Sequence, residues 1–176
     1  MKLLLTALLL AISTAASAAE CPALLKHSVK TLQGQTLDLC QYADRPILVV
    51  NTASKCGFTR QFETLESMDR KLRDKGLVVI GFPSNDFRQE LKSNQEIGSF
   101  CKLTYGVKFP MVEAGAVTGP KAHPFYQQLA ARTGQAPQWN FHKYLVTPGA
   151  KQVYSFSTET EPDDPQVMKL LTPYLK

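Results

Sequence analysis

The sequence predicts an α/β fold in which a central mixed sheet is flanked by helices and preceded by an N-terminal β-hairpin. Residues 47–50 (ILVV) and 77–82 (LVVIGF) are short apolar runs, which are typical of strands buried on both faces of a sheet. Between them, four apolar residues recur at helical spacing: Phe62, Leu65, Met68 and Leu72. Because a strand, a helix and a strand in this order form a crossover unit, the two strands should run parallel.

The other elements follow from similar patterns. Alternation over residues 29–39, with a turn at residues 33–34 (QG), predicts the hairpin. Ser93 and Glu96 have capping-box spacing and open a helix that should end near Gly106. Further elements are expected in this order: a strand at 109–112, a helix at 124–131, a hairpin of strands 141–146 and 153–156 around Pro148 and Gly149, and a closing helix with Val167, Leu170, Leu171 and Tyr174 buried.

The first residues have the pattern of a secretory signal peptide over residues 1–18. Lys2 precedes an apolar stretch, Leu3 to Ile12, that is too short to span a bilayer, and residues 16–18 (ASA) suit cleavage before Ala19. A buried N-terminal helix is the alternative, but no polar face interrupts the apolar stretch. We therefore expect an exported protein that is periplasmic or secreted.

Residues 19–176 are expected to form one soluble domain without stable membrane insertion. The chain has 176 residues, 44% of them hydrophobic, which is enough for one sizeable core. A lipid anchor is disfavoured because Glu20 precedes Cys21. The net charge of +5 is spread among acidic residues, so the sequence lacks the basic footprint of a nucleic-acid-binding protein.

Export would place the four cysteines in an oxidising compartment, where an even number favours disulfides. Cys21, Cys40, Cys56 and Cys101 allow three complete pairings, and the sequence alone does not choose among them. The hairpin places Cys40 beside the segment that leads back to Cys21, so a bridge between these two is one candidate. No C-x-x-C motif occurs, and we expect neither a metal nor a cofactor.

Cys56 lies in the stretch NTASKCGFTRQF, residues 51–62, between a predicted strand and a predicted helix. It follows Lys55 and comes just before a helix N-terminus, two features that favour the thiolate. The carboxyl end of a central strand is also where α/β sheets place active sites. From this pattern alone a reactive thiol, a half-cystine and an inert buried thiol stay open. The three histidines, His27, His123 and His142, are expected at the surface rather than as bases for Cys56.

Three motifs resemble those of the glutathione peroxidase family, in that family's order. NTASKCGFT resembles its peroxidatic-cysteine motif, GFPSNDF its second motif, and WNFHKYLV its Trp-Asn motif. The similarity covers nearly the whole mature chain. It implies a thioredoxin-like fold and a hydroperoxide reductase with Cys56 as the attacking thiolate. Trp139 and Asn140 would donate hydrogen bonds to the sulfur, which stabilise an ionised thiolate and help the departing oxygen to take up charge.

Asp86 occupies the position of the family's glutamine. An ionised carboxylate cannot donate a hydrogen bond and would oppose a nearby thiolate. Two alternatives stay open: Asp86 turns away and Asn85 or Gln89 helps, or Asp86 is protonated in the site and donates as an acid. We expect the backbone and the Trp139–Asn140 pair to provide most of the hydrogen bonds to the sulfur. Asp86 is then only the positional equivalent of the glutamine.

Cys101 matches the resolving cysteine of the family's thioredoxin-dependent branch, and the alternative is a small buried helix residue. The resemblance implies that the Cys56 sulfenic acid condenses with Cys101, for which the helix around Cys101 must unwind or shift. A thioredoxin-like protein or glutathione would return the electrons, and the former is favoured in an oxidising compartment. Cys21 and Cys40, which lie outside the catalytic motifs, would form a structural bridge.

The segment RTGQAPQWNF, residues 132–141, passes directly into the Trp-Asn motif, whereas the family's tetrameric members carry an extra segment there. We therefore expect a monomer whose sulfur is open to lipid hydroperoxides or to a protein reductant. Two other functions are alternatives to the peroxidase. One is a peroxide-sensing relay that passes oxidation from Cys56 to a client protein, and the other is a redox-inert fold with four half-cystines.

Overall fold

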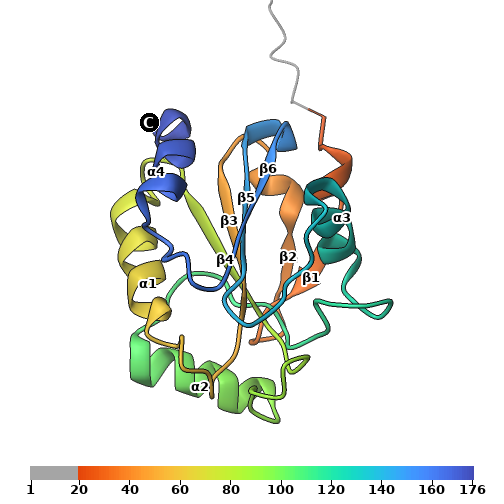
Figure 1. Ribbon diagram of the computed structural model, residues 1–176, viewed down its shortest axis with the longest axis vertical. Coiled ribbons are helices and arrows are strands. Elements are labelled where there is room, and N and C mark those ends of the chain that lie inside the picture. The colour runs from red at the N-terminus through yellow and green to blue at the C-terminus, as the bar shows by residue number, and fades with distance from the viewer. Residues whose placement is uncertain (1–19) are drawn as a thin grey trace, which may run out of the picture.

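The computed structural model describes residues 20–176, and the expected signal peptide over residues 1–18 lies outside them (Figure 1). The central sheet has four strands in the order β4-β3-β5-β6. Its members are β3 (Ile47–Thr52), β4 (Val78–Pro83), β5 (Lys143–Val146) and β6 (Val153–Phe156). β3 and β4 pair in parallel, while β5 is antiparallel to both β3 and β6. The predicted mixed sheet and its parallel crossover are confirmed.

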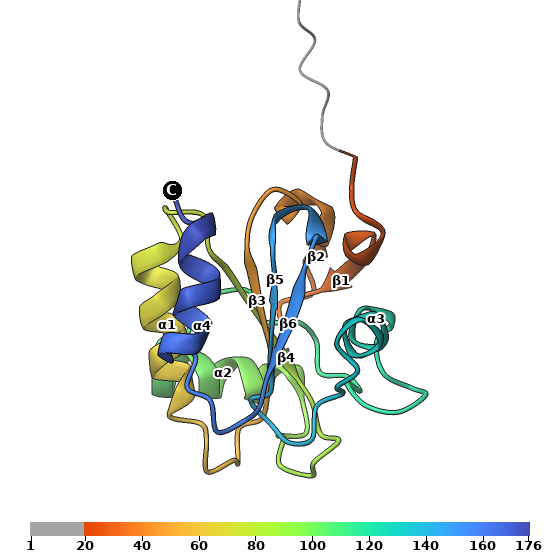
Figure 2. The same cartoon turned by 45° about the horizontal axis from the view of Figure 1, so that its top comes forward.

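Helices cover both faces of this sheet, as Figure 2 shows. They are α1 (Gln61–Leu72), α2 (Asn94–Tyr105), α3 (Pro124–Thr133) and α4 (Pro165–Leu171). α1 and α4 lie on one face, and α3 lies on the other beside the N-terminal hairpin. Alternate residues of β3 point to opposite faces, so Ile47 and Val49 join one apolar cluster while Leu48 and Val50 join the other. The expected α/β layers are therefore confirmed.

None of the helices in residues 20–176 combines the length and the apolar character needed to cross a membrane. The closing helix is shorter than predicted, because α4 ends at Leu171 and a 3₁₀ turn, Thr172–Tyr174, follows it. Ser93 caps α2 as predicted: its hydroxyl accepts from the Glu96 backbone N–H, and the Glu96 carboxylate accepts from the Ser93 N–H.

The N-terminal hairpin consists of β1 (Ser28–Lys30) and β2 (Thr36–Asp38), which pair antiparallel as predicted. The strand expected at residues 109–112 was wrong: this segment makes only two isolated bridges, from Met111 to Gly81 and from Val112 to Thr31. Pro110 has no N–H to donate, which interrupts a regular ladder. The segment nevertheless connects the hairpin to the edge of β4.

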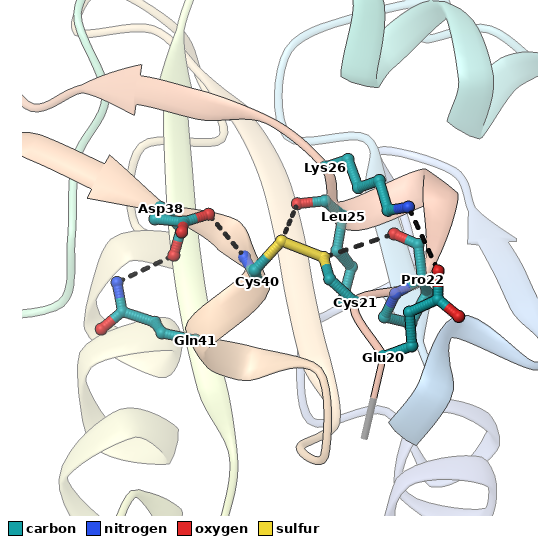
Figure 3. The surroundings of a disulfide bond; sticks show 8 residues. All are labelled: Glu20, Cys21, Pro22, Leu25, Lys26, Asp38, Cys40 and Gln41. Carbon is teal, nitrogen blue, oxygen red and sulfur yellow. Dashed lines mark hydrogen bonds and ion pairs between the residues drawn. A yellow bond between two sulfur atoms is a disulfide. The ribbon is translucent and has the colours of Figure 1, made fainter. Parts of the chain in front are cut away.

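A disulfide joins Cys21 to Cys40, as Figure 3 shows. Cys21 lies just before the 3₁₀ turn Ala23–Leu25, and Cys40 lies within the 3₁₀ turn Leu39–Tyr42. The Asp38 carboxylate caps this second turn by accepting from the Cys40 N–H at 3.0 Å. The expected structural bridge is present, and it ties the start of the described chain to the segment that enters β3.

Removal of this disulfide should lower the free energy of unfolding of the domain without altering its folded structure at 25 °C. The two cysteines are 19 residues apart, and the bridge restricts the unfolded chain over that loop. Cys21→Ala combined with Cys40→Ala should lower the free energy of unfolding by about 3 kcal/mol, measured by urea denaturation. The far-ultraviolet circular dichroism spectrum at 25 °C should match that of the wild type. A changed spectrum would mean that the bridge is needed for the native fold and not only for its stability.

Candidate active site

Three loops meet at one end of the central strands of the sheet. β3 and β4 end together, since Thr52 pairs with Pro83, and β5 begins at the same edge, since Lys143 pairs with Val50. Figure 1 shows the connecting segments below the sheet. They comprise residues 53–60, 84–93 and 134–142. The sheet therefore brings together the three motifs that the sequence spreads over about half of its length.

Cys56 lies in the first of these loops, five residues before α1 begins at Gln61. Its side chain is free and buried, with 6% of its surface exposed, and it borders an apolar cluster that includes Phe62 and Phe141. The backbone N–H of Phe58 points toward the Cys56 Sγ at 3.5 Å. Lys55 and Gly57 on either side are exposed, so the loop itself faces solvent while the sulfur lies beneath it.

Asn51, at the end of β3, holds the Trp-Asn motif against the Cys56 loop. Its side-chain Nδ2 donates to the Trp139 carbonyl at 3.0 Å, and its own carbonyl accepts from the Phe141 N–H at 2.6 Å. Asn51 is completely buried. Phe141 has a φ of 62°, a left-handed conformation that is uncommon for an aromatic residue and is stabilised by these contacts.

Trp139 and Asn140 differ sharply in exposure. Trp139 is 41% exposed, and its ring packs against Phe87 with centroids 5.4 Å apart. A cavity of about 540 Å³ opens beside it, lined in part by His142 and Thr158. Asn140 is fully buried, and its Nδ2 donates to the Gln89 Oε1 at 2.8 Å. The Trp-Asn pair thus contributes one group to the surface and one to the interior.

Asp86 is directed to a different part of the structure. Its Oδ2 accepts from the N–H groups of Val117 and Thr118, each at 2.8 Å, and from the Thr118 hydroxyl at 2.9 Å. Within residues 20–176 no hydrogen bond joins the Asp86 side chain to Trp139, Asn140 or the Cys56 loop. The carboxylate therefore anchors the loop that leads to α3, while Gln89 contacts Asn140.

Glu90 is a buried carboxylate that the sequence analysis did not identify. Its Oε1 accepts from the Ser54 N–H at 3.0 Å and from the Leu91 N–H at 2.7 Å. Burial raises the pKa of Glu90, and these hydrogen bonds oppose that rise. The preceding residue, Gln89, accepts from the Lys55 N–H through its carbonyl at 2.8 Å. Residues 89–90 therefore hold the Cys56 loop by hydrogen bonds to the backbone of Ser54 and Lys55.

Lys143 is a second group that the sequence analysis missed. It is completely buried, and its Nζ donates to the Gln61 Oε1 at 2.8 Å and to the Thr158 carbonyl at 3.3 Å. Burial lowers the pKa of Lys143 to about 7. The Thr158 hydroxyl in turn donates to the Asn140 carbonyl at 2.8 Å. This network connects the start of α1 to the Trp-Asn motif. A polar residue within an apolar strand was the signal that could have revealed it.

Cys101 is a free thiol in α2, buried in the same apolar cluster as Cys56. Burial, together with the charge of Glu90, raises the pKa of Cys101 to about 12. The thiol is therefore protonated at neutral pH in this conformation. A cavity of about 410 Å³ between α2 and the hairpin reaches Cys101, with Leu32 and Met111 in its wall.

The chain matches the family model described as glutathione peroxidase over residues 24–130. It is 40% identical to the glutathione peroxidase of Lactococcus lactis over 82% of this chain and 96% of that protein. It is 38% identical to the thioredoxin/glutathione peroxidase BtuE of Escherichia coli over 83% of this chain and 93% of that protein. Among solved structures, T. cruzi GPX1 superposes with a TM-score of 0.69 at 28% identity, covering 86% of this chain and 95% of that one.

The expectation that all three histidines lie at the surface was wrong for His142, which is buried with its Nε2 2.8 Å from the Ser155 hydroxyl. Burial, together with the charge of the neighbouring Lys143, lowers the pKa of His142 from 6.5 to about 4. His142 is therefore neutral in the folded protein at pH values where it is protonated in the unfolded chain.

Protonation of His142 should therefore destabilise the fold in acid. Because the unfolded chain binds this proton below pH 6.5 and the folded chain only near pH 4, the free energy of unfolding should fall across this window by about 3 kcal/mol. Urea denaturation of the wild type and His142→Gln at pH 7, 5.5 and 4 measures this fall. The variant should show a clearly smaller fall. An equal fall in both proteins would assign the acid sensitivity to other groups.

Proposed function

The chain belongs to the glutathione peroxidase family and is a peroxidase, and we propose that it reduces hydroperoxides through Cys56, with Cys101 as the resolving thiol. The observation that carries this proposal is the setting of Cys56, a free thiol at the meeting point of three loops that also hold Trp139 and Asn140. Hydrogen peroxide and organic or lipid hydroperoxides are the proposed substrates. The cavity of about 540 Å³ beside Trp139 offers room for an organic substituent.

In the proposed first step, the Cys56 thiolate attacks the terminal peroxide oxygen. A sulfur–oxygen bond forms, the oxygen–oxygen bond breaks, and the alkoxide takes up a proton and leaves as an alcohol, or as water from hydrogen peroxide. The indole N–H of Trp139 and the second N–H of the Asn140 amide are the proposed donors, since Gln89 holds only one of the two amide hydrogens. Donors at this position stabilise the thiolate and then the departing oxygen.

In the proposed second step, the Cys101 sulfur attacks the sulfur of the Cys56 sulfenic acid. A disulfide forms, the sulfur–oxygen bond breaks, and the hydroxyl leaves as water with the proton of Cys101. The raised pKa of the buried Cys101 disfavours this step in the closed conformation. We therefore propose that α2 opens before resolution, for which the cavity of about 410 Å³ on its hairpin side leaves space.

A dithiol protein of the thioredoxin type is the proposed reductant, with glutathione as the alternative. The E. coli relative carries both reductants in its name. Export to the periplasm or to the medium is proposed from two features, the signal pattern over residues 1–18 and the Cys21–Cys40 disulfide. In such a compartment a dedicated thioredoxin-like partner is the better electron source. The protein is proposed to act as a monomer.

Disulfide mapping after exposure to one equivalent of hydrogen peroxide tests the two-cysteine mechanism. Mass spectrometry of the wild type should show a Cys56–Cys101 bridge beside the Cys21–Cys40 bridge. Cys101→Ser should accumulate the Cys56 sulfenic acid, which dimedone traps, and Cys56→Ser should lose rapid peroxide consumption. Steady turnover of the wild type with excess reduced thioredoxin distinguishes an enzyme from a relay. A wild type that reacts rapidly but forms no Cys56–Cys101 bridge would contradict the proposed resolution.

Loss of the α2 cap should speed resolution if opening of α2 limits it. Ser93→Ala removes a capping box and should destabilise α2 by about 1 kcal/mol, so the rate of disulfide formation after a peroxide pulse should rise about fivefold. Intrinsic tryptophan fluorescence in a stopped-flow experiment follows this step. Asp164→Ala, which removes the N-cap of α4, is the matched control and should leave the rate unchanged. Equal rates in all three proteins would show that helix opening is not limiting.

A further inference from the structure

Asp86 stands where the family's glutamine is expected, and its carboxylate is occupied by the loop at Val117 and Thr118. The site thus lacks an amide at that position. The geometry points to Gln89 as a positioning residue that orients the Asn140 amide toward Cys56. This inference rests on the proposed role of Asn140 as a hydrogen-bond donor to the sulfur.

Gln89 contacts both of the loops that the reaction needs. Its carbonyl accepts from the Lys55 N–H at 2.8 Å, next to Cys56 in the chain. Its side-chain Oε1 accepts from the Asn140 Nδ2, also at 2.8 Å. A single residue therefore fixes the distance between the Cys56 loop and the Asn140 side chain.

The chemistry of the contact determines which way the Asn140 amide faces. An amide oxygen only accepts, so Gln89 Oε1 binds the NH₂ end of Asn140 and fixes the direction of its remaining N–H. Asn140 is fully buried, and its backbone carbonyl accepts from the Thr158 hydroxyl, so the residue has little freedom to turn. Gln89 is also neutral, and it supplies this acceptor without adding a negative charge that would oppose the thiolate.

The backbone on both sides of the contact is fixed in an uncommon conformation. Arg88, directly before Gln89, has a φ of 60°, and Phe141, directly after Asn140, has a φ of 62°. Such left-handed conformations of residues other than glycine cost free energy and persist only where the surroundings determine them. Both sides of the Gln89–Asn140 hydrogen bond are therefore preorganised by the fold.

A double-mutant cycle on the rate of Cys56 oxidation by hydrogen peroxide tests this inference. The rate constant of Cys56 with hydrogen peroxide is measured by stopped flow for the wild type, Gln89→Met, Asn140→Ala and the double variant. Gln89→Met removes the acceptor at similar size and should slow the reaction about tenfold. In the Asn140→Ala background the same change should alter the rate by less than twofold, because the two residues act as one unit.

Two further variants separate positioning from general structure. Gln89→Glu keeps an acceptor for Asn140 but adds a charge, so the midpoint of its pH–rate profile should move to higher pH. Gln152→Met, in the exposed turn between β5 and β6, is the matched control and should react like the wild type. Thermal unfolding of each variant checks that the fold is intact.

The outcomes distinguish this inference from the function on which it rests. If Asn140→Ala slows the reaction and Gln89→Met does not, the role of Gln89 is overturned. The same holds if Gln89→Met slows the reaction equally with and without Asn140. If Asn140→Ala leaves the rate unchanged, the proposed donor role of Asn140 fails first, and the role of Gln89 fails with it.

Discussion

The hydrogen bonds between Asn51 and the Trp139–Phe141 segment are the constraint on which the rest of the site depends. Asn51 is the second-to-last residue of β3, just before the Cys56 loop begins, and it contacts a segment 88 residues later in the chain. Because the Asn51 Nδ2 donates to the Trp139 carbonyl and the Asn51 carbonyl accepts from the Phe141 N–H, two buried hydrogen bonds hold the two loops in one arrangement. The sheet brings the motifs to one edge, but this contact determines how they face each other.

Buried polar side chains beneath the loops add further hydrogen bonds that hold them in place. Glu90 supports the Cys56 loop through Ser54, and Lys143 links Gln61 to Thr158, which holds Asn140. Each group is paired within the interior, so the loops rest on shared buried hydrogen bonds. α2 lies outside these hydrogen bonds. In the proposed mechanism, oxidation therefore takes place on loops that these hydrogen bonds support, while the resolving thiol Cys101 lies on a helix that they do not hold.

The sequence predicted those features that local patterns determine. Residues 47–50 and 77–82 are apolar runs that became β3 and β4, and the Ser93 capping box begins α2 as expected. The segment 109–112 failed as a strand because Pro110 interrupts its ladder, so that only isolated bridges form with Thr31 and Gly81. The roles of Asn51 and Lys143 likewise depend on residues far away in the chain. The chemical mismatch at Asp86 was visible from the sequence, but its partner loop, about thirty residues later, was not.

The Cys21–Cys40 bridge has a consequence for how electrons are delivered. It lies near the start of β3, where the Gly149 N–H of the β5–β6 turn donates to the Ala43 carbonyl, whereas Cys56 follows the end of the same strand. A six-residue strand separates its two ends by roughly 17 Å. In the proposed mechanism, a reductase that docks against the loops around Cys56 therefore meets the Cys56–Cys101 disulfide and not the Cys21–Cys40 bridge. The same small domain can then carry a structural disulfide that the reductase of its catalytic disulfide does not contact.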